Sequence, residues 1–412
     1  MGKWVKERLD KIMEVNPRSD CLPSEFIYID LESVKQGRLL QQKIVGKDGA
    51  PSRAQRTLKP KDVLFQLVRP YQQNNYYFEP HDERDYVAST GYAVLRTGQD
   101  SKFCYYLLHR NEFQSRVEAL CTGTGYPAIT PKEFSRIDVC HPVSLDEQRH
   151  IAEILTACDE VIEKSEAVAE KYRAIKEGML KDLFTRGIGK NGKLRPSPES
   201  APQLYKDTAL GKVPREWEIK NLGEIGRFVA GNGFPLQYQG RKDGQYPFFK
   251  VSDFNGWANT NVMSIANHYV SDDVVRILGC NVIPARSIVF AKIGAAIMLE
   301  RKRMVAVASC IDNNMMSLQV DGANDSLVLH FLQNYKFSDL VEATALPALK
   351  TTSLKKICLA IPRDPAEQQQ IAERLSAIDA KIADELAVIA KYRKVKAGLM
   401  ARLLTPPDGE VE

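Results

Sequence analysis

The sequence lacks the features that would place it in a membrane or outside the cell. No apolar run approaches the roughly 18 residues needed to cross a bilayer. The first residues, MGKWVKERLDKIMEV, are charged and have no apolar centre, so they do not predict a secretory signal. The eight cysteines are scattered, with no C-x-x-C pair and no histidine at ligand spacing. We therefore expect a cytoplasmic protein with reduced thiols, no structural zinc and no membrane association.

Motifs for catalysis and cofactor binding are also missing. The segment GTGYPA, from Gly123, matches the G-x-G-x-x-A dinucleotide pattern, but Pro127 would disrupt the helix that this pattern must open, so we predict a turn. The sequence has no Walker A loop and no Asn/Asp-Pro-Pro-aromatic motif for amino methylation. The triplet Glu-Ile-Lys at Glu218 lacks the upstream aspartate of a metal-dependent nuclease. These absences predict a non-catalytic chain without a metal or cofactor of its own.

Length and charge leave the function open. A chain of 412 residues is too long for one compact core, so two or three domains are expected. The net charge of +5 permits a polyanionic partner but is too small to establish one.

An internal repeat is the strongest signal in the sequence. A shift of 220 residues aligns 147–185 with 367–405 without a gap, and about 18 of these 39 positions are identical. The match extends upstream in the same register, where Pro127-Ala128 aligns with Pro347-Ala348. Trp4 and Trp217 open the two copies. The chain is therefore a tandem of two units, each a variable region followed by a near-identical segment.

Both repeated segments are predicted to be long helices. Ser144 and Glu147 match a capping box, and Asp364-Pro365 supplies an N-cap and an N1 proline to the second segment. Apolar residues then recur at coiled-coil spacing. About 40 residues at 1.5 Å each make a rod of about 60 Å, which cannot bury its apolar stripe within its own small domain. We therefore expect the two helices to pair with each other.

The C-terminal halves of these helices carry matched glycines and basic residues. Gly178 and Gly398 are either tolerated defects or sites of close approach by another helix or a partner. The basic residues beside them form either a solvated face or a surface for an acidic partner or DNA. The candidate partner-binding residues are Lys171, Tyr172, Arg173, Lys176, Lys391, Tyr392, Arg393 and Lys396.

These patterns divide the chain into six segments. They are a first variable domain (1–143), a central helix (144–186), a Gly/Pro/Ser-rich linker (187–213), a second variable domain (214–362), a C-terminal helix (363–405) and a tail (406–412). Each variable domain mixes strand-like with helix-like runs, which predicts an α+β fold. The strand-like runs are FIYIDL, DVLFQLV, YVASTGYAVLR, PFFKVSD, SIVFAKIG and NNMMSLQV, and the helix-like runs are YYLLHRNEFQSRVEAL and LVLHFLQNYKFSDLVEA.

One loop, RPYQQNNYYFEPHDER from Arg69 to Arg84, is a candidate for base recognition. Gln and Asn can bond adenine edges, Arg can read guanine and Tyr can pack on sugar or base, although a polar surface hairpin is the simpler alternative. The second domain offers basic and hydroxyl residues suited to phosphates, which position a protein without specifying sequence. The candidate DNA-binding residues are Arg53, Arg69, Tyr71, Gln72, Gln73, Asn74, Asn75, Tyr76, Arg84, Arg241, Lys242, Lys250, Lys292, Arg301, Lys302, Lys350, Thr351, Thr352 and Lys355.

Several stretches together resemble the specificity (S) subunit of type I restriction-modification systems. They include GKVPREWEIKNLGEIG from Gly211, PFFKVSDF, SIVFAKIGAA, and the pair ICLAIPRDPAEQQQIAERL and IDVCHPVSLDEQRHIAEIL. Trp4 departs from this pattern because it lacks the Gly-x-Pro-x-x-Trp approach seen at Trp217. The resemblance implies two mixed α/β target recognition domains in pseudo-twofold tandem, separated by two long antiparallel coiled-coil helices.

The resemblance also implies a function and partners. Each recognition domain would read one half of an asymmetric bipartite site in double-stranded DNA. The helices would dock two methyltransferase (M) subunits, which methylate adenine, and restriction (R) subunits would join in the full complex. S-adenosylmethionine, ATP and magnesium would belong to those partners, and this chain would hold no cofactor.

Three alternatives remain open at the level of sequence. The chain could be a solitary DNA-binding regulator with a coiled-coil rod and no enzyme partner. It could be a methyltransferase or nuclease with unfamiliar motifs. It could be a coiled-coil spacer with no role on nucleic acid.

Overall fold

The computed structural model describes residues 3–19, 21–256, 259–341 and 346–406. The chain divides into two compact units: unit 1 comprises residues 1–166 and 387–412, and unit 2 comprises residues 167–386. The two repeated segments form helices α5 (Leu145–Thr185) and α9 (Pro365–Leu403). Each unit therefore contains one variable region together with a part of both long helices.

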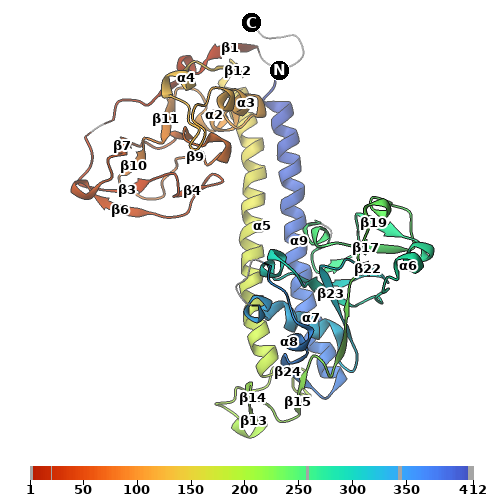
Figure 1. Cartoon of the computed structure of the whole chain (residues 1–412). Helices are drawn as coiled ribbons and strands as arrows, with labels where there is room; N and C mark the ends of the chain where they lie inside the picture. Colours follow the sequence, from red (N-terminus) through yellow and green to blue (C-terminus); the bar gives the residue numbers. More distant parts are fainter. Residues whose placement is uncertain (1–2, 20, 257–258, 342–345, 407–412) are drawn as a thin grey trace. The chain divides into compact units, whose positions relative to one another are not determined.

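Among the described residues, unit 1 contains two four-stranded sheets, the pair of β1 with β12, the hairpin β4–β5 and several short helices (Figure 1). The sheets have the strand orders β6-β3-β10-β7 and β2-β11-β8-β9, and β1 pairs with β12. Their elements are β1 (Trp4–Arg8), α1 (Leu9–Ile12), β2 (Met13–Val15), β3 (Glu25–Ile29), β4 (Val34–Lys35), β5 (Arg38–Leu39), β6 (Lys43–Gly46), β7 (Ala54–Thr57), β8 (Val63–Gln66), β9 (Tyr76–Tyr77), β10 (Tyr86–Ser89), β11 (Tyr92–Thr97), α2 (Ser101–Leu107), α3 (Asn111–Ala119), α4 (Pro131–Ser135) and β12 (Asp138–Pro142).

Unit 2 also contains two larger sheets and a strand pair that leads into a long helix, but its sheets have five and three strands. A five-stranded sheet has the order β16-β23-β20-β21-β18, a three-stranded sheet has the order β19-β17-β22, and β15 pairs with β24. The elements are β13 (Tyr205–Thr208), β14 (Gly211–Pro214), β15 (Trp217–Asn221), β16 (Gly226–Ala230), β17 (Tyr246–Phe249), β18 (Val262–Met263), β19 (His268–Val270), α6 (Asp272–Leu278), β20 (Ile288–Ala291), β21 (Lys302–Val305), β22 (Cys310–Ile311), β23 (Met315–Val320), α7 (Asp325–Asn334), α8 (Thr351–Lys355) and β24 (Cys358–Pro362).

The strand pair that leads into each long helix has the same register in both units. Trp4 lies opposite Pro142 in unit 1, and Trp217 lies opposite Pro362 in unit 2. A buried glutamine in the first turn of the helix fixes each junction. Gln148 donates to the Pro142 carbonyl at 2.8 Å, and its counterpart in unit 2 donates to the Pro362 carbonyl at 2.7 Å. The repeat therefore extends from sequence to backbone hydrogen bonding.

The predicted pairing of the long helices is confirmed in each unit. In unit 1, Asp159 of α5 bonds Lys396 of α9, and in unit 2, Lys176 of α5 bonds Asp379 of α9. In unit 1, Glu166 also bonds Arg393, and in unit 2, Lys381 lies over the ring of Tyr172. Because the higher residue number on α5 pairs with the lower one on α9 in each unit, the segments run antiparallel, side by side (Figure 1). The apolar face of α5 is buried with the core of each variable region, through Leu155 in unit 1 and Leu183 in unit 2.

Three local predictions are wrong. The run from 105 to 120 forms two helices, α2 and α3, because the chain turns at 108–110, and α7 likewise ends at Asn334 before a short 3-10 turn. The run from 86 to 96 forms two strands, β10 and β11, which belong to different sheets because Thr90 and Gly91 reverse the chain between them.

The segment predicted as a linker is folded onto unit 2. Arg195 is buried and pairs with Glu367 in the first turn of α9, with Nη2 to Oε2 at 2.9 Å. The same carboxylate accepts from the indole nitrogen of Trp217 and from the backbone of Ile188. This pairing raises the pKa of Arg195. The interaction of one carboxylate with three donors ties the end of α5 to the start of α9.

Over the described residues, no helix combines the length and apolar character required to span a bilayer.

Candidate DNA-recognition surfaces and the paired helices

The loop that follows β8 in unit 1 is held in one conformation by a buried glutamine. Gln66, the last residue of β8, donates through Nε2 to the Val68 carbonyl at 2.8 Å and to Gln72 Oε1 at 2.9 Å. Its Oε1 accepts from the backbone N–H of Asn74 at 3.1 Å. Gln66 was not among the predicted site residues because it lies within a predicted strand, DVLFQLV. One side chain therefore bridges both ends of the connection between β8 and β9, which is the first part of the candidate recognition loop.

Asn75 is also part of this scaffold. It is buried, and its Oδ1 accepts from the backbone N–H of Gln66 at 2.8 Å. Its amide nitrogen faces His109 at 3.3 Å. Because both ends of this side chain have protein partners in the core, we remove Asn75 from the candidate base-reading residues.

The remaining loop residues present a polar and aromatic surface. Tyr71 is 54% exposed, and Gln72 and Gln73 are exposed beside it. The guanidinium of Arg69 lies 4.2 Å from the ring centroid of Tyr126, which is 70% exposed. Tyr126 lies in the predicted GTGYPA turn, which is present in the structure, and sequence analysis did not select it. Stacked Arg and Tyr groups are suited to base faces and sugar.

The other candidates of unit 1 differ in availability. Arg53 is exposed, and Asn74 and Tyr76 are half-buried. Arg84 is exposed but bonds Asp82 through Nε at 2.8 Å, and Nη2 bonds Gln42 at 2.9 Å. The adjacent carboxylate raises the pKa of Arg84. Arg84 would have to exchange these surface partners for a phosphate.

Lys302 of unit 2 was predicted to contact DNA, but the structure places it in the core. Its side chain is 1% exposed, and Nζ bonds Glu300 and the Tyr335 carbonyl while lying 4.3 Å from the ring centroid of Phe337. Burial lowers the pKa of Lys302. Because its ammonium has an internal carboxylate partner and faces the core, Lys302 is a structural residue.

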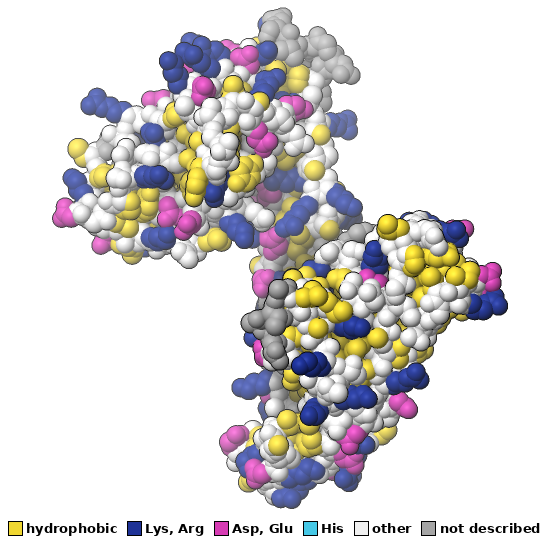
Figure 2. Space-filling model, in the orientation of Figure 1, with side chains coloured by type: hydrophobic (Ala, Val, Ile, Leu, Met, Phe, Trp, Pro, Cys, Tyr) yellow, Lys and Arg dark blue, Asp and Glu magenta, His cyan; other side chains and the backbone are white. Residues whose placement is uncertain are grey.

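The other unit 2 candidates lie at or near the surface. Arg241, Lys242, Lys350, Thr352 and Lys355 are exposed, and Lys250, Lys292, Arg301 and Thr351 are half-buried. Lys250 donates to Gln239 at 3.0 Å, and Arg301 bonds Asn255. Figure 2 shows Lys and Arg side chains interspersed with hydrophobic ones on the visible face of unit 2. This mixture differs from the polar loop of unit 1.

The helix contacts change the interpretation of the candidate partner-binding residues. Lys396 bonds both carboxylate oxygens of Asp159 at 2.6 and 2.7 Å, and Lys176 bonds Asp379 at 2.6 Å. Arg393 bonds Glu166 at 2.7 Å. Each of these three basic residues therefore pairs with a carboxylate of the other helix; Lys176 and Lys396 are half-buried, and Arg393 stays exposed.

The rest of that predicted surface remains on the outside of the helices. Lys171 and Lys391 are exposed, Tyr172 and Tyr392 are half-buried, and Arg173 bonds Glu170 on its own helix. A Cβ added at Gly178 or Gly398 would meet nothing within 4 Å. The glycines are therefore not required by packing between the two helices. Ile175 and Val395, one turn earlier, are matched exposed apolar residues.

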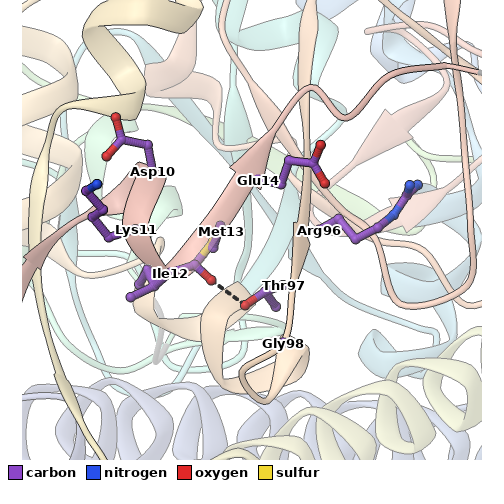
Figure 3. Close-up of a pocket in the computed structure, with 8 residues that line it drawn as sticks. All are labelled: Asp10, Lys11, Ile12, Met13, Glu14, Arg96, Thr97 and Gly98. Carbon is purple, nitrogen blue, oxygen red and sulfur yellow. Dashed lines mark hydrogen bonds between the residues drawn. The ribbon is translucent and has the colours of Figure 1, made fainter.

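A shallow pocket in unit 1 does not have the arrangement of an active site. Its lining residues are Asp10, Lys11, Ile12, Met13, Glu14, Arg96, Thr97 and Gly98. Figure 3 shows the carboxylates of Asp10 and Glu14 on separate sides of the pocket, with Thr97 Oγ1 donating to the Ile12 carbonyl at 2.5 Å. Arg96 is held by Asp62. Among the residues that the structure describes, no group of three or more His, Cys, Asp or Glu could hold a metal ion.

Comparison with known proteins agrees with this two-part architecture. The sequence matches the "Type I restriction modification DNA specificity domain" family over residues 30–171 and again over residues 214–390. The chain belongs to this family.

Individual relatives agree with the family match. The MjaVIII specificity subunit of a type I restriction enzyme from Methanocaldococcus jannaschii is 25% identical over 326 residues, which cover 74% of this chain and 70% of that protein. The MjaIX specificity subunit from the same organism is 21% identical over 316 residues, covering 76% and 70%. The crystal structure of a type I restriction-modification S subunit from M. genitalium covers 98% of this chain and 97% of its own, with a TM-score of 0.62 and 15% identity. That structure shares the fold.

Proposed function

We propose that this chain is the non-catalytic DNA-recognition subunit of a type I restriction-modification complex in the cytoplasm. The variable regions of units 1 and 2 each read one half of an asymmetric, bipartite site in double-stranded DNA. The paired helices dock two methyltransferase subunits. The complete complex adds restriction subunits.

The observation that carries the proposal is the recurrence of one helix pairing in both units. Lys396 with Asp159 and Lys176 with Asp379 are the same two positions of the repeat, 220 residues apart, with the helices exchanged. A single chain with this internal symmetry presents equivalent surfaces twice, as two identical partners require. The exposed faces at Ile175 and Val395 are equivalent in the same way.

The long helices repeat the same contacts in both units, whereas the variable regions expose different side chains. The candidate loop of unit 1 exposes Tyr71, Gln72 and Gln73. The corresponding turn of unit 2 exposes Met298 and Leu299. Because different side chains contact different base edges, the two half-sites should differ and the target should not be palindromic.

Chemistry on the DNA is assigned to the partners. Methylation of adenine inside a duplex requires extrusion of the base into an enclosed pocket beside S-adenosylmethionine. We assign that pocket and cofactor to the methyltransferase subunits. ATP and magnesium are assigned to the complete restriction complex. This chain recognises the DNA sequence and sets the distance between the half-sites.

Reconstitution tests the proposal. The chain is expressed with and without its cognate methyltransferase, and mass, DNA binding and adenine methylation are measured. We expect two methyltransferase subunits per chain, and methylation of one bipartite sequence only when both proteins are present. Sequencing of methylated positions in the host genome then gives the site.

Two results would contradict it. Sequence-specific binding by a chain that never associates with a methyltransferase would identify a solitary regulator. Methylation or cleavage by the purified chain, supplied with S-adenosylmethionine, ATP and magnesium, would identify an enzyme.

A further inference from the structure

The two units place one exposed turn on the same backbone framework. In unit 1, Val68 forms a bridge with Ala128, and the N–H of Arg69 donates to the Pro127 carbonyl at 2.7 Å. In unit 2, Ile293 forms a bridge with Ala348, and the N–H of Gly294 donates to the Pro347 carbonyl at 2.8 Å. These contacts align Arg69 with Gly294, and Tyr126 with Leu346.

The turns of the two units share their type of helix and their left-handed last residue, but the unit 2 turn is two residues longer. A short 3-10 helix follows the aligned residues, over Pro70–Gln72 in unit 1 and Ala295–Leu299 in unit 2. A residue with positive φ precedes each turn: Arg69 is in the left-handed region with φ of 55° and ψ of 54°, whereas Gly294 has φ of 83° and ψ of -174°. Gln73 and Glu300 end the two turns with φ of 51° and 52°. We call residues 69–73 with Tyr126 the polar knuckle, and residues 294–300 with Leu346 the apolar knuckle.

The exposed chemistry of the two knuckles is opposite. The polar knuckle exposes Tyr71, Gln72 and Gln73, which donate and accept hydrogen bonds. The apolar knuckle exposes Met298 by 48%, Leu299 by 56% and Leu346 by 67%. A methyl carbon of Leu346 would lie 3.9 Å from a Cβ placed on Gly294, so Leu346 lies against the start of the turn. Exposed apolar groups on one turn and on the residue against its start favour a partner that covers them.

We propose that the apolar knuckle reads thymine, through the C5-methyl group, in the half-site bound by unit 2. This inference rests on the proposed function. Leucine side chains cannot hydrogen-bond a base edge and Met offers at most a weak sulfur acceptor. The thymine methyl is the apolar feature that a base edge presents in the major groove.

Basic residues next to the apolar knuckle favour DNA over an apolar protein surface as its partner. The backbone of Lys292 accepts from the N–H of Leu349 at 2.9 Å, which places Lys292 and Lys350 on the two strands of chain that support the knuckle. Lys350 is exposed and Lys292 is half-buried. Lysines close in the chain to an apolar contact surface suit the phosphates that flank a base pair.

The test uses the complete complex with its methyltransferase and DNA whose site has been read from genomic methylation. Each thymine is replaced in turn by uracil, which pairs identically and lacks only the methyl group. In the unit 2 half-site we expect about three- to fivefold weaker binding at a contacted thymine, the effect of one buried methyl-sized group. A Met298→Ala, Leu299→Ala double variant should bind the thymine and uracil duplexes equally.

Matched variants of the polar knuckle show whether the uracil effect belongs to the apolar knuckle. Tyr71→Ala with Gln73→Ala, on the polar knuckle, should alter binding to the unit 1 half-site and leave the uracil effect in the other half-site unchanged. Thermal melts of each variant show that the fold is retained. Loss of the methyltransferase from a folded Met298→Ala, Leu299→Ala complex would overturn the inference, since the apolar knuckle would then be a protein contact.

Three DNA results would also overturn the inference: a unit 2 half-site without thymine, equal binding of thymine and uracil by the native complex, or a uracil effect that survives the double variant. Equal binding combined with a dependence on flexible base steps would indicate a wedge inserted between bases. A native complex that binds no specific sequence at all is a different outcome, because it contradicts the proposed function itself.

Discussion

Lys396 and Asp159 form a bidentate ion pair between the two long helices of unit 1, with Nζ at 2.6 and 2.7 Å from the carboxylate oxygens. Tyr106 donates to the same carboxylate at 2.8 Å and bonds Thr156 at 3.1 Å. Thus one aspartate of α5 joins α9 to the short helix α2 of the variable region.

Unit 2 repeats this junction with two changes of side chain, from Tyr106 to His330 and from Thr156 to Ser376. Lys176 bonds Asp379, and His330 of α7 bonds Ser376 at 3.1 Å, while its Nδ1 lies 3.6 Å from the same aspartate. Thr156 and Ser376 are equivalent positions of the repeat, as are Asp159 and Asp379. Tyr106 and His330 therefore occupy the same place in the two units.

The first prediction concerns the stability of these pairs. Lys176→Met leaves Asp379, which is only 10% exposed, without its cation, so we expect unit 2 to lose about 1–3 kcal/mol of stability in denaturant unfolding. Lys396→Met should cost unit 1 less because Asp159 is 39% exposed. Arg276→Met, which breaks a pair open to solvent, is the control and should change stability by less than about 0.5 kcal/mol.

The exchange variant Lys176→Asp with Asp379→Lys should recover part of that loss, because opposite charges again face each other. Equal effects of Lys176→Met and Arg276→Met would show that the pair does not stabilise unit 2.

The second prediction concerns the support of the polar knuckle. Gln66→Leu replaces the amide with an apolar side chain of similar size and so removes the bonds to Val68, Gln72 and Asn74. We expect a stability loss of about 1–3 kcal/mol and weaker discrimination in the unit 1 half-site, with the other half-site unchanged. Gln73→Ala, at an exposed position, should stay within about 0.5 kcal/mol of the native stability. A Gln66→Leu complex that reads both half-sites normally would show that this scaffold is dispensable for recognition.

Sequence reasoning was effective where the repeat supplied the constraint. The register that pairs Pro127-Ala128 with Pro347-Ala348 also predicted equivalent places in the fold, and these residues form the same bridge in each unit. The helix starts followed from local capping chemistry, and the N–H of Ala366 donates to Asp364 at 2.9 Å as the N-cap pattern predicts.

What sequence reasoning missed depended on tertiary contacts. Asn75 and Lys302 are residue types that favour the surface, but each is buried because a partner distant in sequence, such as Gln66 or Tyr335, satisfies it. The equivalence of Tyr106 with His330 was hidden because their spacing is 224 residues, outside the register of the helices. Linker composition gave no sign that Arg195 would bind Glu367.

The third prediction concerns acid stability. Burial lowers the pKa of His330 and of His109 to about 4. For His330 the nearby ammonium of Lys176 also offsets the attraction of Asp379. Above pH 6.5 both histidines are neutral whether the chain is folded or unfolded. Below it the unfolded chain binds protons that the folded chain does not, so stability falls as the pH drops from 6.5 towards 4.

At pH 5 the expected loss is about 2 kcal/mol for each of these histidines. His330→Gln retains a side-chain amide near Ser376 and cannot titrate, so its stability difference between pH 7.5 and pH 5 should be smaller by about that amount in denaturant unfolding. His81→Gln, at an exposed position, is the control. An unchanged pH dependence in His330→Gln would mean that this histidine does not contribute to acid sensitivity.

The fourth prediction tests whether the long helices set the length of DNA between the half-sites. A four-residue helical insertion after residue 166 in α5 and after residue 386 in α9 falls at the unit boundaries, so the contacts inside each unit are kept. One added turn is about 6 Å, and the duplex rises about 3.4 Å per base pair, so the unread spacer should lengthen by about two base pairs. Sequencing of methylated sites in cells that carry the variant measures it, with a four-residue insertion at the exposed Gly49 as the control. Unchanged half-sites with a longer spacer are expected, whereas an unchanged spacer would show that another part of the complex sets the distance.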